Sequence, residues 1–516
     1  MKSHTGKLRR PLLVLGTILA GGAALGLPLS PANARQGAEQ VIGDRSIGDA
    51  IEDEYLFDDA VPYDRIDVQA EDGLVTLSGG VSSLLVKRRA RRIAETVKGV
   101  EAVVNGIDVA PALDRSATQI DASVEAALRR NPATESYEVS VLATGDGMVT
   151  LGGTVDSWAE RDLAETVAAG VRGVTGIENA VAVEYDTTRA DPTIETEVKE
   201  RLKWSALVDS GLIGVAVEDG RVTLSGAVGS AAERRMAKTL AWVTGVTRVD
   251  TSALQVERWA RDPDLRAMPR IISDATVREA VSRAILYDPR VDRENVAVTA
   301  EGGDVTLRGT VDSIAARLAA ERLAENTTGV LDVENRLKVR LSEPVAEDEL
   351  HDRIEAAFVD DPLIDATAVE VTVSDGTVWL YGSVDHYYEK GRVENVVAQV
   401  DGVTSIVNNL TVENPNRPFT FDPYVDPWPT RAYPWYDYEP GISLEEDREI
   451  SREIDDQLWW SPYVDADEVT VTVADGIATL TGTVDSFAER RAAAQNAFQG
   501  GATWVVNKLD VDTGDT

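Results

Sequence analysis

One short pattern of apolar and polar positions returns six times along the 516-residue chain. Each time, apolar residues alternate with polar ones, as at Val139 and Val141, and lead into a phrase such as "GLVTLSGGV". Alternation with a period of two predicts a half-buried strand. The six phrases begin at Gly73, Gly147, Gly220, Gly303, Gly376 and Gly476, with longer intervals after the third and fifth copies. This regular spacing indicates that one folding unit has been copied.

Two glycines in each phrase predict the turns of the unit. The first follows Asp in five copies and Gly302 in the remaining one, and these residue types tolerate the positive φ of a tight hairpin. The second ends the strand, and we expect it to let the chain bend closely beneath a helix. The structural glycines are Gly73, Gly79, Gly147, Gly153, Gly220, Gly226, Gly303, Gly309, Gly376, Gly382, Gly476 and Gly482.

Two amphipathic helices complete the unit. Apolar residues at Leu163 and Val167 recur at helical spacing after the phrase. Capping boxes are predicted at Ser157 to Glu160, Ser230 to Glu233 and Ser486 to Glu489. An earlier helix, such as 120–132, ends at a proline in four copies. The unit is therefore helix, strand, strand, helix, strand, and the last two strands should run parallel because a helix joins them.

The combined pattern "DGxVTLxGxVDS…GVxxVxNxLxV" resembles the BON domain, a family named from an osmotically induced periplasmic protein and nodulation proteins. The expected fold class is α+β, with six tandem small αββαβ domains, each a three-stranded mixed sheet covered by two helices. The resemblance implies residence in the bacterial envelope, no enzymatic activity, and suggested roles in phospholipid binding or periplasmic chaperoning. It spans 45–110, 116–184, 191–256, 272–341, 347–413 and 443–512, with a linker at 257–271 and an insertion at 414–442.

The first 34 residues predict an export signal. A basic start is followed by the apolar run 11–29 and by the small residues Ala32-Asn33-Ala34. We expect cleavage after Ala34 and a periplasmic location, and the competing interpretation is a retained membrane anchor. The chain has no cysteine, which excludes disulfides and a lipid-modified cysteine.

Charge narrows the classes of partner. The chain has 51 Lys and Arg against 88 Asp and Glu, a formal net charge of −37. Because nucleic-acid binding depends on neutralising phosphates with basic residues, this balance argues against a nucleic-acid partner.

A search for chemistry finds no catalytic pattern. The repeated glycines lack the Gly-Lys-Ser/Thr ending of a nucleotide site. His351 and His386 have no partner histidine or cysteine at ligand spacing, and no calcium loop or "GxSxG" nucleophile elbow occurs. We therefore expect no enzyme, no cofactor, no metal and no nucleotide.

The first candidate binding feature is the basic run "KRRARR" on the second helix of the first copy. Its cations suit an anionic lipid surface, where each contributes about 1 kcal/mol. The alternative is a solvated face that pairs with the next acidic unit. The residues are Lys87, Arg88, Arg89, Arg91 and Arg92.

A second feature is a bulky apolar residue that opens the second helix in five copies. These candidate exposed apolar contacts are Leu84, Trp158, Ile314, Tyr387 and Phe487, and Ala231 is the exception. Trp158 lies off the apolar stripe of its helix, so we expect it to be partly exposed. It suits an interface with lipid or protein, but it equally suits a cap on its own sheet or a stack against a neighbouring copy.

The insertion at 414–442 is rich in proline and aromatic residues. Proline favours extended segments, and aromatic side chains are costly to leave in water. The insertion either straps across the last two domains or docks a partner through residues such as Trp428, Trp435 and Tyr436.

These features lead to one functional hypothesis and two rivals. The first is a non-enzymatic envelope-maintenance protein of osmotic stress, whose copies bind anionic phospholipid membrane surfaces weakly and act together. The alternative is a periplasmic chaperone or scaffold that binds unfolded or outer-membrane proteins. A third possibility is a spacer that spans the periplasm.

Overall fold

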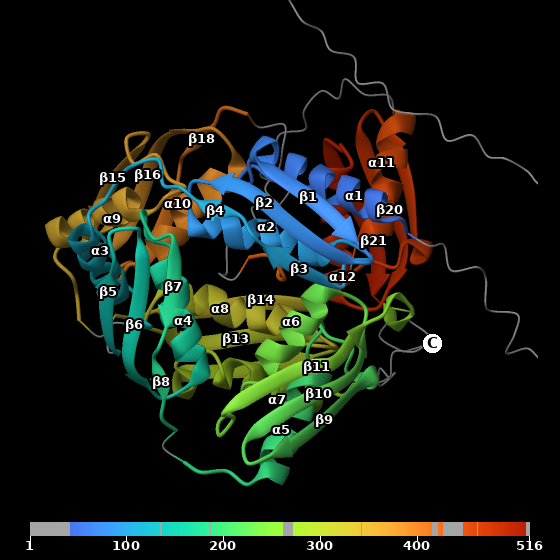
Figure 1. Ribbon diagram of the computed structural model, residues 1–516, viewed down its shortest axis with the longest axis horizontal. Coiled ribbons are helices and arrows are strands. Elements are labelled where there is room, and N and C mark those ends of the chain that lie inside the picture. Colours follow the sequence, from blue (N-terminus) through green and yellow to red (C-terminus); the bar gives the residue numbers. More distant parts are fainter. Residues whose placement is uncertain are drawn as a thin grey trace, which may run out of the picture. The chain divides into compact units, whose positions relative to one another are not determined.

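The computed structural model describes residues 42–134, 137–185, 187–261, 272–341, 343–414, 422–426, 447–461 and 463–511. The predicted signal and cleavage site, linker residues 262–271, and the candidate docking residues Trp428, Trp435 and Tyr436 lie outside this part. The described residues form six α+β copies in which a small mixed sheet packs against helices (Figure 1), which confirms the predicted fold class. No helix in the described ranges is long and apolar enough to cross a membrane.

The first three copies have the element order that the sequence predicts. Copy one contains α1 (Asp44–Phe57), β1 (Ile66–Glu71), β2 (Leu74–Val81), α2 (Leu84–Thr96), β3 (Ala102–Asn105) and β4 (Asp108–Val109). Copy two contains α3 (Ala117–Arg130), β5 (Glu138–Ala143), β6 (Met148–Val155), α4 (Trp158–Ala169), β7 (Gly176–Asn179) and β8 (Ala182–Val183). Copy three contains α5 (Asp191–Lys203), β9 (Ile213–Glu218), β10 (Arg221–Val228), α6 (Ala231–Leu240) and β11 (Arg248–Val256).

The last three copies repeat this order. Copy four contains α7 (Asp274–Leu286), β12 (Val296–Glu301), β13 (Asp304–Val311), α8 (Ile314–Glu325) and β14 (Asp332–Val339). Copy five contains α9 (Glu347–Asp360), β15 (Val369–Ser374), β16 (Thr377–Val384), α10 (Tyr387–Ala398), β17 (Ser405–Asn408) and β18 (Thr411–Val412). Copy six contains α11 (Asp447–Trp460), β19 (Val469–Ala474), β20 (Ile477–Val484), α12 (Phe487–Gln499) and β21 (Trp504–Val511).

The strand that carries the repeated phrase is central in every sheet. In copy one, β1 pairs with β2 antiparallel, and β3 pairs with the other edge of β2 in parallel. The same order holds in the other copies, as the crossover through the second helix predicts. In copies one, two and five the third strand is interrupted, so that a short piece such as β4 continues the pairing.

The predicted tight hairpin forms in five copies and is longer in copy two. In copy one, Asp72 and Gly73 have φ of +49° and +74°, as a two-residue turn requires. In copy two the turn covers 144–147 instead, between β5 and β6. There the Asp146 carboxylate accepts hydrogen bonds from the hydroxyl of Thr144 and the amide of Met148. The tight turn expected at Asp146-Gly147 is therefore wrong.

The second glycine of each phrase is required by the neighbouring strand and not by a helix. Gly79 has a φ of +115° and pairs with Ile66 at the start of β1. A Cβ atom there would lie 2.1 Å from the carbonyl oxygen of Arg65. The equivalent glycines of the other five copies meet a backbone carbonyl at a similar distance. The expected close approach is thus present, but its partner differs.

The second helices begin at the predicted serines, with a shifted cap. Ser157 accepts a hydrogen bond from the amide of Glu160 at 3.2 Å. In a standard capping box the glutamate carboxylate would accept a hydrogen bond from the amide of the serine itself. Here the Glu160 carboxylate accepts from the amide of Asp156, the preceding residue, at 2.9 Å. Copies three and six repeat this arrangement, so the glutamate fixes the strand-to-helix turn as well as the helix start.

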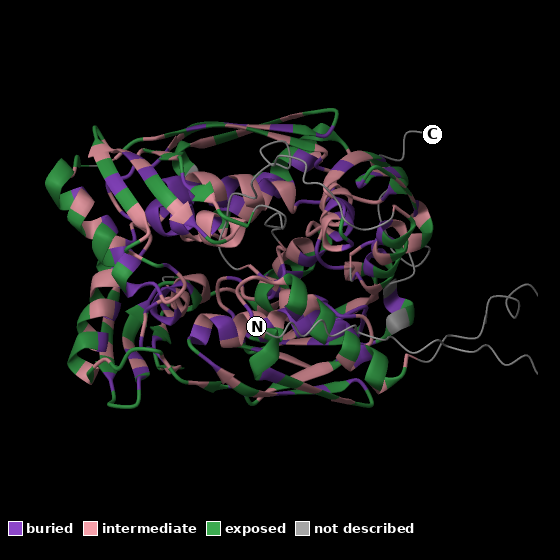
Figure 2. Cartoon of the chain, turned by 90° about the horizontal axis from the view of Figure 1, so that it is seen from above, coloured by how far each residue is buried: buried purple, intermediate pink, exposed green. Residues whose placement is uncertain are grey.

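An asparagine joins the second helix to the third strand in five copies. In copy four, the side-chain amide of Asn335 donates to the carbonyl of Arg317 at 2.9 Å, and its oxygen accepts from the amide of Leu337 at 3.1 Å. Figure 2 shows the buried residues gathered where helices meet sheets and the exposed residues on the outer faces. Each copy therefore has its own core, and the asparagine holds its second helix beside its third strand.

We expect Gly79→Ala to destabilise copy one by at least roughly 2 kcal/mol, because the added Cβ meets a carbonyl oxygen and the positive φ is strained. Gly48→Ala is the matched control in α1, where nothing lies within 4 Å of the added atom. It should stabilise by roughly 0.5–1 kcal/mol, since alanine favours a helix. Hydrogen exchange of copy-one amides measures both, and equal effects would contradict the assignment.

Candidate functional site: contacts between copies and an arginine-lined cavity

Ion pairs between second helices join the copies. Arg88 on α2 contacts Glu165 on α4 at 2.6 Å, and Arg235 on α6 contacts Glu95 on α2 at 2.6 Å. In the other half of the chain, Arg491 on α12 contacts Glu325 on α8 at 2.7 Å. Glu95 is 5% exposed, so its pairing with Arg235 and with Arg91 takes place largely away from water.

The bulky residue that opens each second helix mostly serves the next copy. Leu84 is 6% exposed and belongs to the core of copy two, while Ile314 is 3% exposed and belongs to the core of copy five. The expectation that these two are exposed contacts is therefore wrong, because a neighbour covers them. Trp158 stacks on Trp242 of copy three, with ring centroids 5.1 Å apart. Tyr387 and Phe487 are half-buried.

A second kind of contact pairs copies from opposite halves of the chain. The loop after a second helix meets the end of another copy's first helix, which pairs copies two with five, three with four and one with six (Figure 1). The contact of copies two and five is reciprocal, with the amide of Arg172 donating to Asp360 at 2.6 Å and that of Asp401 to Arg130 at 2.8 Å. The contact of copies three and four is reciprocal too, with the amides of Thr328 and Ala206 donating to the carbonyls of Trp204 and Asn326, both at 2.9 Å. In the contact of copies one and six, Lys98 Nζ donates to the carbonyl of Trp459 at 3.3 Å.

The basic run of copy one lies at these junctions. The Arg89 guanidinium, 11% exposed, contacts Asp58 at 2.7 Å and also pairs with Asp426. Arg88 pairs with the next copy, as the solvated-face alternative expected, and Lys87 is half-buried. Arg91 is half exposed and pairs with Glu95, whereas Arg92 donates to the carbonyl of Val425 at 3.2 Å. The five cations thus do not form an open basic face.

Residues 422–426 of the insertion are held among copies one, three and six. Tyr424 is 5% exposed, and its hydroxyl donates to the carbonyl of Leu207 in copy three. Its ring stacks on Tyr463 of copy six, with centroids 4.4 Å apart. Asp426 pairs with Arg89 of copy one. This part of the insertion is a strap, but it reaches three copies instead of joining only the last two.

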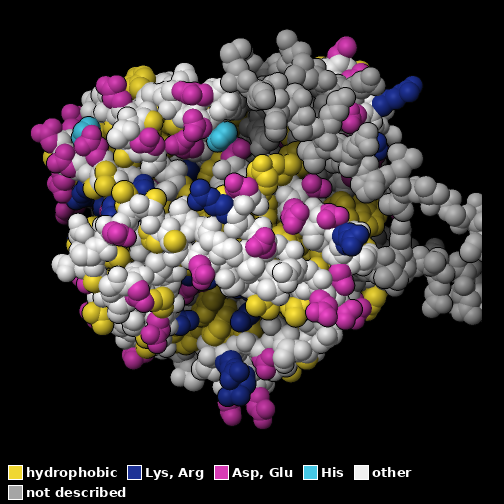
Figure 3. Space-filling model, turned by 45° about the horizontal axis from the view of Figure 1, so that its top comes forward, with side chains coloured by type: hydrophobic (Ala, Val, Ile, Leu, Met, Phe, Trp, Pro, Cys, Tyr) yellow, Lys and Arg dark blue, Asp and Glu magenta, His cyan; other side chains and the backbone are white. Residues whose placement is uncertain are grey.

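A cavity of about 1530 Å³ opens between copies one to four and this segment. Its polar wall includes Arg92, Arg201, Arg234 and Arg235, and its aromatic wall includes Trp158, Trp204, Trp242 and Tyr287. Among the described residues, this wall carries nine Lys or Arg and seven Asp or Glu side chains, a small positive excess in a chain whose net charge is negative. On the outer face drawn in Figure 3, Asp and Glu side chains are widely spread.

Two arginines on this wall have lowered pKa values. Burial, with Arg235 and Arg88 nearby, lowers the pKa of Arg92 to about 9. Burial also lowers the pKa of Arg201 to about 10, although Glu197 and Asp288 act in the opposite direction. In both cases burial is the largest cause, because it disfavours the charged form.

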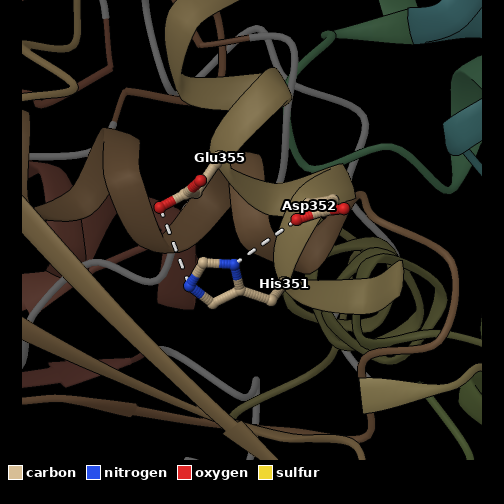
Figure 4. Close-up of side chains that lie close together, drawn as sticks. All are labelled: His351, Asp352 and Glu355. Atoms are coloured by element: carbon tan, nitrogen blue, oxygen red, sulfur yellow. Dashed lines mark ion pairs between the residues drawn. The ribbon is translucent and has the colours of Figure 1, made fainter. Parts of the chain in front are cut away.

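His351, Asp352 and Glu355 lie close together on α9. His351 Nδ1 lies 3.8 Å from a carboxylate oxygen of Asp352, and Nε2 lies 3.7 Å from one of Glu355 (Figure 4). Each carboxylate faces a different nitrogen of the imidazole ring. A metal ion would need one ring nitrogen and both carboxylates directed at the same point, so this arrangement is that of a surface ion-pair cluster. Asp352 and Glu355 are exposed. The group therefore carries no functional assignment.

We expect Tyr424→Ala to destabilise the junction of copies one, three and six by roughly 3–5 kcal/mol, because a buried aromatic ring and its hydrogen bond are lost. Tyr63, which is 54% exposed, provides the control Tyr63→Ala. Urea unfolding should show a clear loss for the first variant and a change below about 0.5 kcal/mol for the second. Similar losses would contradict the role of the strap.

Stability should also decrease as pH rises from about 5 to 8. Burial, followed by Asp422 and Asp58, raises the pKa of Glu54 to about 8 from 4.5, so the folded chain holds a proton that the unfolded chain releases earlier. We expect a loss of roughly 1–3 kcal/mol in urea unfolding between these limits. Glu54→Gln should remove most of it and leave the part that arises from Asp422, whose pKa burial raises to about 6. Glu125→Gln on the exposed face of α3 should leave the loss unchanged. An unchanged slope in Glu54→Gln would refute this origin.

Comparisons with known proteins agree with the repeated unit. A model of the BON domain matches residues 43–111, 116–185, 190–258, 273–340, 346–414 and 446–513. The chain is 26% identical over 192 residues to Osmotically-inducible protein Y of Escherichia coli (strain K12), which covers 34% of this chain and 96% of that protein.

Two solved structures of CdsD, a structural protein of the type III secretion system of Chlamydia trachomatis, also match. One is 14% identical, with coverage of 40% of this chain and 91% of that chain and a TM-score of 0.12. The other, its C-terminal domain, is 16% identical, with coverage of 44% and 100% and a TM-score of 0.12. Scores this low carry no functional argument. The family model, however, matches most of the chain in six successive stretches, and the protein therefore belongs to the BON domain family.

Proposed function

We propose that this chain is a non-enzymatic, exported protein of the bacterial envelope that acts in osmotic stress by binding anionic phospholipid surfaces. The observation that carries the proposal is the similarity to Osmotically-inducible protein Y together with the six BON copies. Family membership and the lack of a catalytic pattern in the sequence support a binding role instead of an enzymatic one. Several weak contacts on one chain act together, which suits a repeat protein.

Apolar hairpin tips are the best-placed surface for this contact. Leu74, Met148 and Ile477 directly follow the hairpin glycines of copies one, two and six, and they are 45%, 40% and 36% exposed. Exposed apolar side chains of this kind favour insertion at a membrane interface. The arginines of the basic run expected to meet lipid already have protein partners, so the tips replace the run as the proposed point of contact.

Flotation with lipid vesicles tests this function. The chain from Arg35 to Thr516 should float with vesicles containing phosphatidylglycerol, and the triple variant Leu74→Ser, Met148→Ser, Ile477→Ser should bind at least tenfold more weakly because its apolar contact is lost. Leu113→Ser, at a residue that is 60% exposed but lies between copies, should bind normally. Absence of flotation under all salt conditions, or equal binding by the triple variant, would overturn the proposal.

A chaperone or scaffold role is the second candidate, favoured by a feature of copy five. Trp379 and Tyr381 occupy outward positions of β16 that hold Thr76 and Ser78 in copy one. Tyr381 is 43% exposed, and Val407, which pairs with Trp379, is 37% exposed. An exposed apolar patch of this kind marks a surface for protein contact. Failure to float, with suppression of the aggregation of a denatured outer-membrane protein, would favour this role.

A further inference from the structure

We propose that the cavity between copies one to four binds one molecule of an amphipathic phosphate, with the phosphate against the arginines and the apolar part against the tryptophans. This differs from contact with a membrane surface, because the ligand is a single molecule held inside the chain. The choice of a phospholipid-like ligand rests on the proposed function, whereas the site itself rests on the cavity wall.

Three arginines on the wall donate only to neutral backbone carbonyls in the described structure. Arg92 donates to Val425 at 3.2 Å, Arg201 to Trp242 at 2.8 Å, and Arg234 to Glu101 at 2.6 Å. A guanidinium has five N–H donors, so most remain available to a ligand. In a chain with 88 acidic residues, arginines that face a cavity without a carboxylate partner call for an explanation.

The carboxylates of the wall compensate these three cations only in part, because most are already engaged with other partners. Their partners are Arg91 and Arg235 for Glu95, Arg88 for Glu165, Arg189 for Glu197, the indole of Trp204 for Glu200, Arg290 for Asp288, and Arg89 for Asp426. Asp162 is the exception, and burial raises its pKa, with Arg92 acting in the opposite direction. A phosphate bound here would gain charge-assisted hydrogen bonds from preformed donors.

The remaining wall suits an apolar group. The stacked rings of Trp158 and Trp242 are nearly parallel, with planes 4° apart, and Trp204 lies on the same cavity. Arg201 sits over the ring of Tyr287 at 4.3 Å, which places a cation and an aromatic surface together. A volume of about 1530 Å³ far exceeds that needed for a phosphate ion and is larger than ordinary small-molecule sites of roughly 300–1,000 Å³, so it leaves room for an attached apolar group. These features favour an amphiphile over a free anion.

Binding of soluble short-chain lipid tests the site. Dihexanoyl phosphatidylglycerol, kept below its micelle concentration, should bind the Arg35 to Thr516 chain with a stoichiometry of one in calorimetry and should change tryptophan fluorescence. Inorganic phosphate tests the charged group alone, and octyl glucoside tests an apolar chain without a phosphate. Each should bind at least tenfold more weakly than the lipid. No saturable lipid binding would overturn the proposal, and equally tight binding of phosphate would overturn its amphipathic part.

Substitutions locate the site. Arg92→Gln and Arg201→Gln should each weaken lipid binding at least tenfold, and Arg92→Lys should restore part of it because the charge is kept. Arg129→Gln, at a side chain that is 66% exposed on α3, is the matched control and should bind normally. Circular dichroism and urea unfolding identify variants that fail to fold. If Arg92→Gln fails to fold, Arg92→Lys replaces it in the binding measurement. Unchanged binding in both folded glutamine variants would place the ligand elsewhere.

The same variants separate this inference from the proposed function. Arg92→Gln and Arg201→Gln should float normally with vesicles, whereas the hairpin-tip variant should retain binding of the soluble lipid. Loss of soluble-lipid binding in the tip variant with retention in the arginine variants would overturn the cavity site and leave the membrane-surface proposal standing. Retained cavity binding without flotation would overturn only the membrane-surface proposal.

Discussion

The guanidinium of Arg89 joins three distant parts of the chain at one buried point. It lies between Asp58 of its own copy and Asp426 of the strap, and over the ring of Tyr388 in copy five, 4.8 Å from its centroid. All three charged side chains are at most 12% exposed. Removing one partner would leave the others charged and poorly solvated, which is costly. Arg89 thereby engages Asp426, a carboxylate that also lines the cavity.

Local patterns were sufficient to predict the repeated fold but not the site. The hairpin at Asp72-Gly73 and the helix start at Ser157 depend on residues within a few positions of one another, so their spacing carries the information. The cavity depends on contacts such as Arg235 with Glu95, which are 140 residues apart. Arg201 and Arg234 lie on ordinary amphipathic helices, and no spacing in the sequence indicates that they share a wall. The second glycine was predicted to be constrained, but its partner strand was not.

The bulky residues that open the second helices explain why exposure was misjudged. Trp158 lies away from the apolar stripe of its own helix, and Leu84 opens the equivalent helix of copy one, so both were expected to be exposed contacts. That reasoning ends at the boundary of one copy, whereas a neighbouring copy supplies a second apolar surface. Burial of these residues therefore stabilises the association of copies instead of their individual folding. A helix that serves two cores has little surface left for an external partner, whereas the hairpin tips and the cavity remain open to one.

The acidic exterior and the arginine-lined interior act over different distances. A net charge of −37 repels an anion while it is far away, but this repulsion is screened within about 8 Å at physiological ionic strength and over shorter distances in stronger salt. Cations within a partly buried wall are screened less, because few ions reach them. Raising the salt concentration thus lowers the barrier to approach more than it weakens attraction inside the cavity. For the cavity ligand proposed above, this difference predicts capture that depends on the ionic strength of the surroundings.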